Sequence, residues 1–561
     1  MKAWNAVRAA RWVGMIVAAV MLNGCGLLSE FQPSVVIKPM TANEYITLQR
    51  GDILTTGKLS ERTAQTIRVT GLDQGACAVT ASAACIQAMS DVEGVLDEQR
   101  MSALSELWLQ VAMRGVRDTK HDDPSGLTPW MEAARHAYAY LFFTPRSPGE
   151  RAFEDRQTQV RDWYNYAVQE AVARMFAVRR NQPVAADSTQ TRFRLGEWLL
   201  DVDLAVRLPE GVDMVKELVP ASSLSFQGLR SIYRRDGFGA ELVAVMEEPA
   251  WGGDGANRAL DSRLEDSAEA TQEMAQHRAA KPVPPAADEA GQTRRNAEEA
   301  QRKRRWAQWR TASWSEMPSP NITVVFRFAG QTLEEVLATH EVEVSVHDPL
   351  VERELTLDDE SVPLAGNFTA GYGLWLARSG FNRQSLSNLF GREDGIERPH
   401  LYMMQPYDPN RRIILMLHGL ASSPEAWVNV ANEIMGDEAL REEFQVWQVY
   451  YPTNLPLVFN HVAIRRLLER TLHHFDPEGT APASDGLVLV GHSMGGMISR
   501  MMISSADEQL WDWALKEHPM DPERLERLRP KADPMLRFEP FPGVERAIPW
   551  CAGLRALSAC L

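Results

Sequence analysis

The apolar residues of the N-terminal part of the chain recur at the spacing of an amphipathic helix. Between about residues 92 and 180, Leu104 and Leu107 fall on one helical face, as in a helix that packs one side against a core. Thr128 followed by Pro129 is a typical helix start. This part of the chain is therefore predicted to be a small helical subdomain.

The period of the pattern then changes to two. Apolar residues such as Leu200 and Val202 alternate with acidic residues, which is typical of strands with one buried face. A β-rich module is therefore predicted, and a two-sheet sandwich is one arrangement for it. The strands expected are Leu200–Val206, Ile322–Phe328 and Val342–Val346.

Beyond about Leu401, short and fully apolar runs alternate with helical stretches. Apolar strands separated by helices are typical of a parallel sheet covered on both faces. The predicted fold class is therefore α/β, with a partial parallel sheet at the C-terminus preceded by the helical subdomain and the β-rich module. The expected strands are 413–417, 446–450 and 487–490, and the expected helices are 424–435 and 461–475.

The first residues have the composition of an export signal. Three cations precede an apolar run from Trp12 to Leu22, which is short for a bilayer span. The residues that lead into Cys25 resemble the lipobox of bacterial lipoproteins, which implies acylation of this cysteine, with palmitate as the expected acyl group. Gly26 resembles the sorting signal for the outer membrane of Gram-negative bacteria, facing the periplasm. A plain secretory signal with a buried Cys25 is the alternative.

These patterns predict four regions in the 561-residue chain. They are a signal peptide over 1–24, a helical region over 25–185, a β-rich module over 186–400 with a charged Ala- and Pro-rich insertion at about 251–320, and an α/β domain over 401–561. No other run is long and apolar enough to cross a membrane.

Charge and cysteine content narrow the functional classes. A formal net charge of −16 argues against a nucleic-acid partner, because phosphate binding requires a surface rich in Lys and Arg. Export makes disulfides feasible, and Cys77 and Cys85 are either one disulfide or two buried thiols. No metal or cofactor is expected, and protein partners are not identified by any pattern.

A serine motif directly follows the apolar run at 487–490. Gly491, His492, Ser493, Met494 and Gly495 form G-x-S-x-G, with an apolar helix face after it. A strand, sharp turn and helix of this kind hold the serine in a strained conformation with its hydroxyl exposed. Glycines are needed where backbone segments come close, and the helix dipole favours negative charge at the same point. Ser493 is the predicted nucleophile.

A second motif, HGLASSPEAW, begins at His418 and follows the strand at 413–417. Both motifs, over about residues 401–548, resemble the α/β-hydrolase superfamily. Within it, these motifs and the Tyr-Tyr-Pro at 450–452 are similar to bacterial lipases and esterases, and also to the inositol-deacylase branch that removes acyl chains from lipid anchors.

The resemblance implies acyl transfer on an ester or lipid. Ser493 attacks a carbonyl group, and the backbone N–H groups of Leu420 and Met494 receive the oxyanion. His418 is implied to be a scaffold residue rather than a catalytic one. The remaining scaffold residues of the elbow and the loop are Gly419, Gly491 and Gly495.

The family's acid and histidine are expected after the serine along the chain. The one histidine found there is His518, in a polar helical stretch where a surface position is expected. A further strand is expected at Val544–Ile548, and the sequence given ends at Leu561. We therefore expect a truncated chain without the triad Asp or Glu and His; a natural short ending is the alternative.

Two functions follow from these observations. The first is a membrane-anchored serine hydrolase whose chain lacks part of its triad. The alternative is a non-catalytic envelope lipoprotein or pseudo-hydrolase that acts as a binding or scaffold protein.

Overall fold

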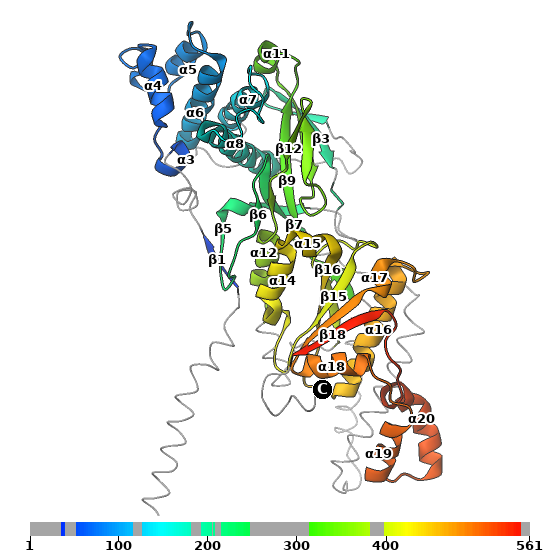
Figure 1. Cartoon of the computed structure of the whole chain (residues 1–561). Coiled ribbons are helices and arrows are strands. Elements are labelled where there is room, and N and C mark those ends of the chain that lie inside the picture. Colours follow the sequence, from blue (N-terminus) through cyan, green and yellow to red (C-terminus); the bar gives the residue numbers. More distant parts are fainter. Residues whose placement is uncertain are drawn as a thin grey trace, which may run out of the picture.

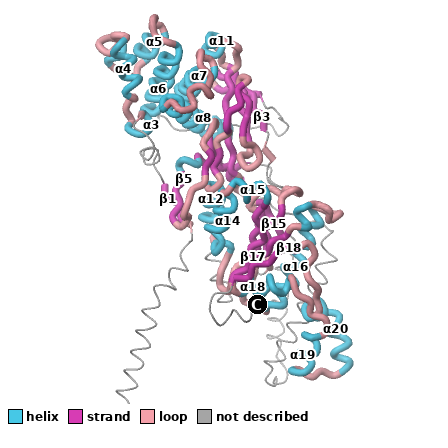
Figure 2. Tube along the Cα trace, viewed as in Figure 1, coloured by secondary structure: helices cyan, strands magenta, loops and turns pink. Residues whose placement is uncertain are grey.

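The computed structural model describes residues 35–39, 52–115, 126–180, 192–207 apart from residue 205, 215–246, 313–381 and 398–550. The signal peptide, Cys25 and most of the insertion expected at 251–320 lie outside these residues. Two sheets, each accompanied by helices, lie one beyond the other (Figures 1 and 2).

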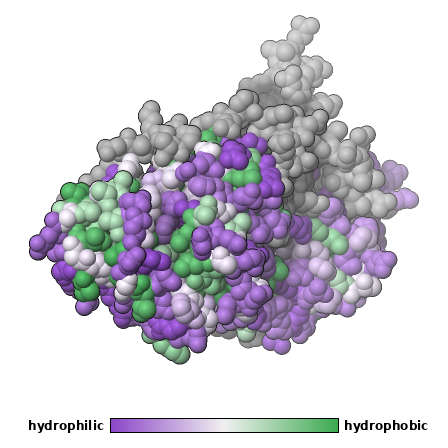
Figure 3. Space-filling model, turned by 90° about the horizontal axis from the view of Figure 1, so that it is seen from above, coloured by the Kyte–Doolittle hydropathy of each residue, from purple (hydrophilic) through white to green (hydrophobic). Residues whose placement is uncertain are grey.

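The predicted helical subdomain is present. Its long helices α6, α7 and α8 pack against one another and bury Trp130 and Trp163. Seen from this end of the molecule, hydrophilic residues with small hydrophobic groups between them cover the surface (Figure 3). The helices are α3 (Ile53–Thr56), α4 (Glu61–Val69), η1 (Ala76–Ala78), α5 (Ala83–Ser90), α6 (Asp97–Gly115), α7 (Thr128–Phe142) and α8 (Asp155–Arg180).

The first sheet has six strands in the order β2-β3-β10-β9-β7-β4. Strands β3 and β10 are parallel, and the other pairs are antiparallel. The strands are β2 (Arg192–Leu195), β3 (Trp198–Leu204), β4 (Val215–Pro220), β7 (Ala240–Met246), β9 (Asn321–Phe328) and β10 (Glu341–His347).

Helices cover this sheet, so the sandwich arrangement was wrong. Leu242 on β7 shares a core with helices α6 to α8, whereas its neighbour Val243 points to the opposite face and packs with Leu374 of α12 (Ala370–Ser379). Alternation along a strand shows that one face is buried, but it does not reveal whether a sheet or helices bury it.

Short elements complete this part of the molecule. β1 (Val36–Pro39) pairs with β5 (Leu224–Gln227), β6 (Arg234–Arg235) with β13 (Gly366–Asn367), and β11 (Glu354–Leu357) with β12 (Glu360–Pro363). The short helices are η3 (Ala221–Ser223) and α11 (Leu333–Ala338).

The second sheet has the order β18-β17-β15-β16-β14-β8. Strands β16, β15, β17 and β18 are parallel, as predicted, while β14 is antiparallel to β16. The strands are β8 (Trp314–Glu316), β14 (His400–Met403), β15 (Arg412–Leu417), β16 (Phe444–Tyr450), β17 (Leu487–His492) and β18 (Val544–Trp550). β8 comes from the region predicted as the β-rich module, and the domain boundaries themselves stay a prediction.

Helices cover both faces of the second sheet. On β15, Ile413 and Leu415 pack with α16, whereas Ile414 and Met416 pack with α12 and α14. This confirms the α/β fold class. The helices are η5 (Pro424–Trp427), α14 (Val428–Gly436), α15 (Glu438–Glu443), α16 (Leu457–Phe475), α17 (Pro482–Asp485), α18 (Met494–Met502), α19 (Gln509–Glu517) and α20 (Pro522–Leu536). In the part of the chain that the structure describes, every helix is too short or too polar to span a bilayer.

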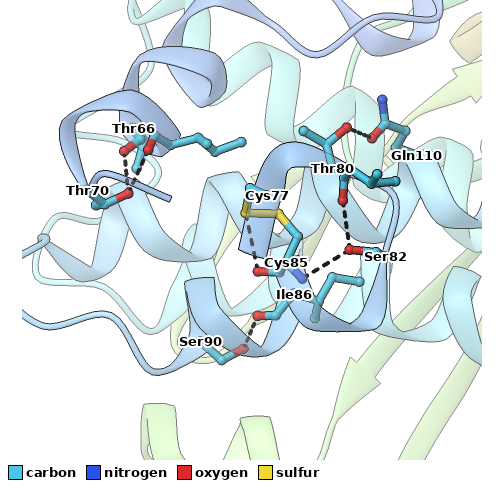
Figure 4. The surroundings of a disulfide bond; sticks show 11 residues. Thr66, Thr70, Cys77, Thr80, Ser82, Cys85, Ile86, Ser90 and Gln110 are labelled. Atoms are coloured by element: carbon cyan, nitrogen blue, oxygen red, sulfur yellow. Dashed lines mark hydrogen bonds between the residues drawn. A yellow bond between two sulfur atoms is a disulfide. The ribbon is translucent and has the colours of Figure 1, made fainter. Parts of the chain in front are cut away.

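Of the two alternatives for Cys77 and Cys85, the structure has the disulfide, between η1 and α5 (Figure 4). Both cysteines are buried in the core of the helical unit. The bond closes a short loop, with a sequence separation of eight residues.

We expect the double variant Cys77→Ser and Cys85→Ser to lose about 2–3 kcal/mol of unfolding free energy, because the unfolded chain is no longer constrained. Urea unfolding with and without a reductant measures this loss. The reductant should lower the midpoint of the wild-type protein and leave that of the variant unchanged. If the reductant leaves the urea midpoint of the wild-type protein unchanged, the prediction is wrong.

Candidate active site

Ser493 lies in a sharp turn between β17 and α18. Its backbone has φ 51° and ψ −114°, a conformation that residues with a Cβ rarely adopt. Its N–H donates to the carbonyl oxygen of Trp550 at 2.8 Å, so β18 supports the turn from the other side. Strain of this kind is found at functional sites, where the surrounding structure holds it in place.

The glycines around Ser493 are required by close backbone packing. A Cβ at Gly491 would lie 2.3 Å from the carbonyl oxygen of Gly495, and a Cβ at Gly495 would lie 2.1 Å from that of Leu417. Neither position has room for any side chain. The helix therefore starts directly on the ends of two neighbouring strands.

The loop after β15 reaches the same place. A Cβ at Gly419 would lie 2.9 Å from Nδ1 of His492 and 3.3 Å from Cβ of Ser493. Tertiary structure thus brings the two predicted motifs together, although they are far apart along the chain. Further along the loop, Ala421 has φ 54°, and its N–H donates to Oγ1 of Thr453 at 3.1 Å.

The two predicted oxyanion donors lie on either side of this contact. Met494 is the first residue of α18, so its N–H has no acceptor within the helix. Leu420 directly follows Gly419, and its side chain is 60% exposed. Their function as donors stays a prediction.

His418 is a buried, neutral residue. Its Nε2 accepts a hydrogen bond from the N–H of Tyr451 at 3.3 Å, and its Nδ1 lies 2.9 Å from the carbonyl oxygen of Gly419. The proton is therefore on Nδ1, which donates to Gly419. The rings of His418 and Tyr451 stack with centroids 4.3 Å apart. Burial lowers the pKa of His418 to about 4, in agreement with a scaffold position.

Sequence reasoning missed three residues that hold the site. Tyr451 supports His418, Thr453 holds the 418–424 loop, and the carbonyl of Trp550 supports Ser493. All three lie at or just after the carboxyl ends of parallel strands. Knowledge of the sheet order would have pointed to these residues, because the carboxyl ends of parallel strands meet at one edge of the sheet.

His518 is exposed at the end of α19. Among the residues that the structure describes, no hydrogen bond joins Ser493 Oγ to a histidine, and the same residues contain no His, Cys, Asp and Glu group suited to a metal ion. His461 is buried against Phe538, with ring centroids 4.6 Å apart, and its two ring nitrogens have no hydrogen-bond partner among the described residues. The structure thus brings Ser493 and Gly419 together, but not His518.

Comparison with known proteins identifies this region. A family model described as "Putative serine esterase (DUF676)" matches residues 408–530, about a fifth of the chain. The match runs from just before β15 into α20 and includes both Gly419 and Ser493. No curated protein and no solved structure matches the chain. The matched region is therefore similar to a serine esterase, and its parallel sheet with helices is consistent with a partial α/β-hydrolase fold.

The buried imidazole of His418 should make the fold sensitive to acid. Its folded-state pKa of about 4 lies below the ordinary value of 6.5, so the unfolded state binds more protons between these values and stability falls as pH falls. We expect His418→Gln to flatten this dependence by up to about 1.4 kcal/mol per pH unit. Urea unfolding at pH 7, 6 and 5 measures it, with the exposed His518→Gln as the control. Identical slopes in wild type and His418→Gln would show that the pKa of His418 is not lowered in the folded state.

Proposed function

We propose that this protein is a membrane-anchored serine hydrolase that cleaves carboxylic esters, with Ser493 as the nucleophile. The observation that carries this proposal is the contact between the strained Ser493 turn and Gly419. That contact places the hydroxyl of Ser493 beside the start of the loop that carries the proposed donor Leu420, the arrangement that acyl transfer needs.

In the proposed reaction, Ser493 Oγ attacks the ester carbonyl carbon and the carbonyl oxygen becomes an oxyanion. The N–H groups of Leu420 and Met494 donate to this oxygen, and the N-terminal dipole of α18 adds to its stabilisation. Collapse of the tetrahedral intermediate releases the alcohol, which takes up the proton from Oγ, and leaves an acyl ester on Ser493. Water then attacks this ester and releases the acid.

Side chains around Ser493 favour an apolar acyl group. Leu420 and Trp550 are 60% and 63% exposed, and Met497, whose N–H donates to the carbonyl oxygen of Ser493, is 43% exposed. Partly exposed apolar residues next to a polar reactive group support a substrate with an apolar chain. The similarity of the motifs to bacterial lipases and to inositol deacylases supports lipid esters in particular.

We expect Ser493→Ala to abolish hydrolysis of p-nitrophenyl butyrate by the full chain. The control is Ser504→Ala, just beyond the end of α18, which should keep the wild-type rate. Loss of the Ser493 hydroxyl removes the covalent route, and any rate that remains comes from the oxyanion donors and binding. Equal rates for wild type and Ser493→Ala would refute the catalytic function.

A second candidate is a pseudo-hydrolase that binds or scaffolds partners in the cell envelope. One observation favours it: within the described residues, Ser493 Oγ has no histidine as hydrogen-bond partner. Covalent labelling of Ser493 by a fluorophosphonate, read by mass spectrometry, separates the two functions, because only a reactive serine is labelled.

The lipobox-like sequence before Cys25 supports anchoring by an acylated cysteine at the bacterial outer membrane, facing the periplasm. Two or more acyl chains hold a protein stably at a membrane surface, whereas one does so weakly.

Replacing Cys25 by Ser should move the protein from the membrane fraction to the soluble fraction, because the acyl chains are lost. Ultracentrifugation of cell lysates followed by immunoblotting measures this shift, and Cys560→Ser serves as the control for loss of a cysteine elsewhere. A variant that still sediments with membranes would exclude lipidation of Cys25 as the attachment.

A further inference from the structure

Helix α14 carries the downstream end of the loop that faces Ser493. The chain leaves β15 at Leu417, passes Gly419, and enters η5 and then α14 at Val428. Within the loop, Ala421 is in a positive-φ conformation and its N–H donates to Oγ1 of Thr453. The position of α14 therefore sets where the backbone N–H of Leu420 lies.

One face of α14 makes contact with a loop of the N-terminal unit. By this unit we mean helices α3 to α8, the first sheet and the short elements beside it. Asn429, Asn432, Glu433 and Gly436 are spaced at three, four and seven positions, so they lie on one side of the helix. All four contact residues 228–233, the segment between β5 and β6, which we call the 228–233 loop.

Asn432 is the centre of these contacts. Its Nδ2 donates to the carbonyl oxygen of Ser231 at 2.8 Å, and its Oδ1 accepts from Oγ1 of Thr369 at 2.8 Å. Thr369 Oγ1 in turn accepts from the N–H of Tyr233 at 2.9 Å. Asn432 and Thr369 are 1% and 0% exposed. A buried network with these groups paired is specific in geometry, because loss of one member leaves the others unpaired.

The two ends of the helix face are held as well. At the start of α14, Asn429 accepts from the N–H of Arg230 at 3.0 Å. At its end, the Tyr233 ring lies so close to the backbone that a Cβ at Gly436 would be 2.1 Å from the ring. The Tyr233 hydroxyl donates to the carboxylate of Glu433. The helix is thus restrained along its whole length.

We propose that the 228–233 loop acts through α14 to position the 418–424 loop, which carries the proposed oxyanion donor Leu420. Asn432 is the main positioning residue. The N-terminal unit then sets the reactivity of Ser493 without touching the substrate. This inference rests on the proposed function. On the sheet side, α14 packs through Val428, Ala431 and Met435, apolar contacts that lack direction, whereas the hydrogen bonds on its outer face define its register.

The test compares Asn432→Ala with Asn165→Ala. Asn165 of α8 makes a matching pair of hydrogen bonds. Its Nδ2 donates to the carbonyl oxygen of Gly237 at 2.8 Å, and its Oδ1 accepts from the N–H of Gly239 at 2.8 Å. It lies in the N-terminal unit, so it reports the effect of losing two such bonds without involving α14. Tyr233→Phe, which removes the hydroxyl that donates to Glu433, is the milder variant if Asn432→Ala does not fold.

Two measurements on the full chain separate positioning from simple stability. Hydrogen exchange of the 419–423 backbone amides should become faster in Asn432→Ala and stay unchanged in Asn165→Ala. The kcat for p-nitrophenyl butyrate should fall about 10-fold or more with KM unchanged, because a displacement near 1 Å costs roughly that much or more. Titration of reactive Ser493 corrects the kcat of both variants for the folded fraction.

The outcomes distinguish this inference from the proposed function. Faster exchange confined to Asn432→Ala supports positioning even if the wild-type chain hydrolyses nothing, in which case only the proposed function fails. Unchanged exchange and unchanged kcat in a folded Asn432→Ala variant overturn the inference. An equal fall of kcat in both variants also overturns it, because the effect is then one of stability.

Discussion

Close packing of α18 on the ends of β15 and β17 is the constraint on which the rest of the site depends. Gly495 touches the carbonyl of Leu417, and Gly491 touches that of Gly495, so neither can carry a side chain. The chain must turn sharply between them, and Ser493 takes a strained conformation that costs of order 1–3 kcal/mol. Burial of Ile498 on the same helix helps to offset that cost.

In the proposed reaction, electrostatic support at Ser493 comes from the backbone. His418 is adjacent to the loop, yet burial keeps it neutral and its Nε2 is occupied by the N–H of Tyr451. The groups that favour negative charge are the backbone N–H groups of the loop and the start of α18. Such dipoles are held in place by the fold and need no reorganisation when charge develops.

The N-terminal unit and the second sheet are joined by a shared core. Helix α12 packs on β7 through Leu374. Through Tyr372, the same helix also packs in the core that α14 forms with the second sheet. Inside that core, Gln448 of β16 donates to the Tyr372 hydroxyl at 2.9 Å. The outermost strand of the second sheet, β8, directly precedes β9 of the first sheet along the chain. The esterase-like region therefore shares a hydrophobic core with the N-terminal unit. In the proposed arrangement, this shared core allows contacts made by α14 to affect the position of the residues around Ser493.

Local patterns determined much of this protein from sequence. Apolar runs and periodicity identified α6 to α8, the parallel strands β15, β16, β17 and β18, and the elbow at Ser493, because each depends on residues close together along the chain. Tertiary structure alone decided which surfaces cover the first sheet, how closely Gly419 packs against Ser493, and that Asn432 bonds to the 228–233 loop. Such contacts join segments far apart along the chain, and their geometry is set by packing, which no local pattern encodes.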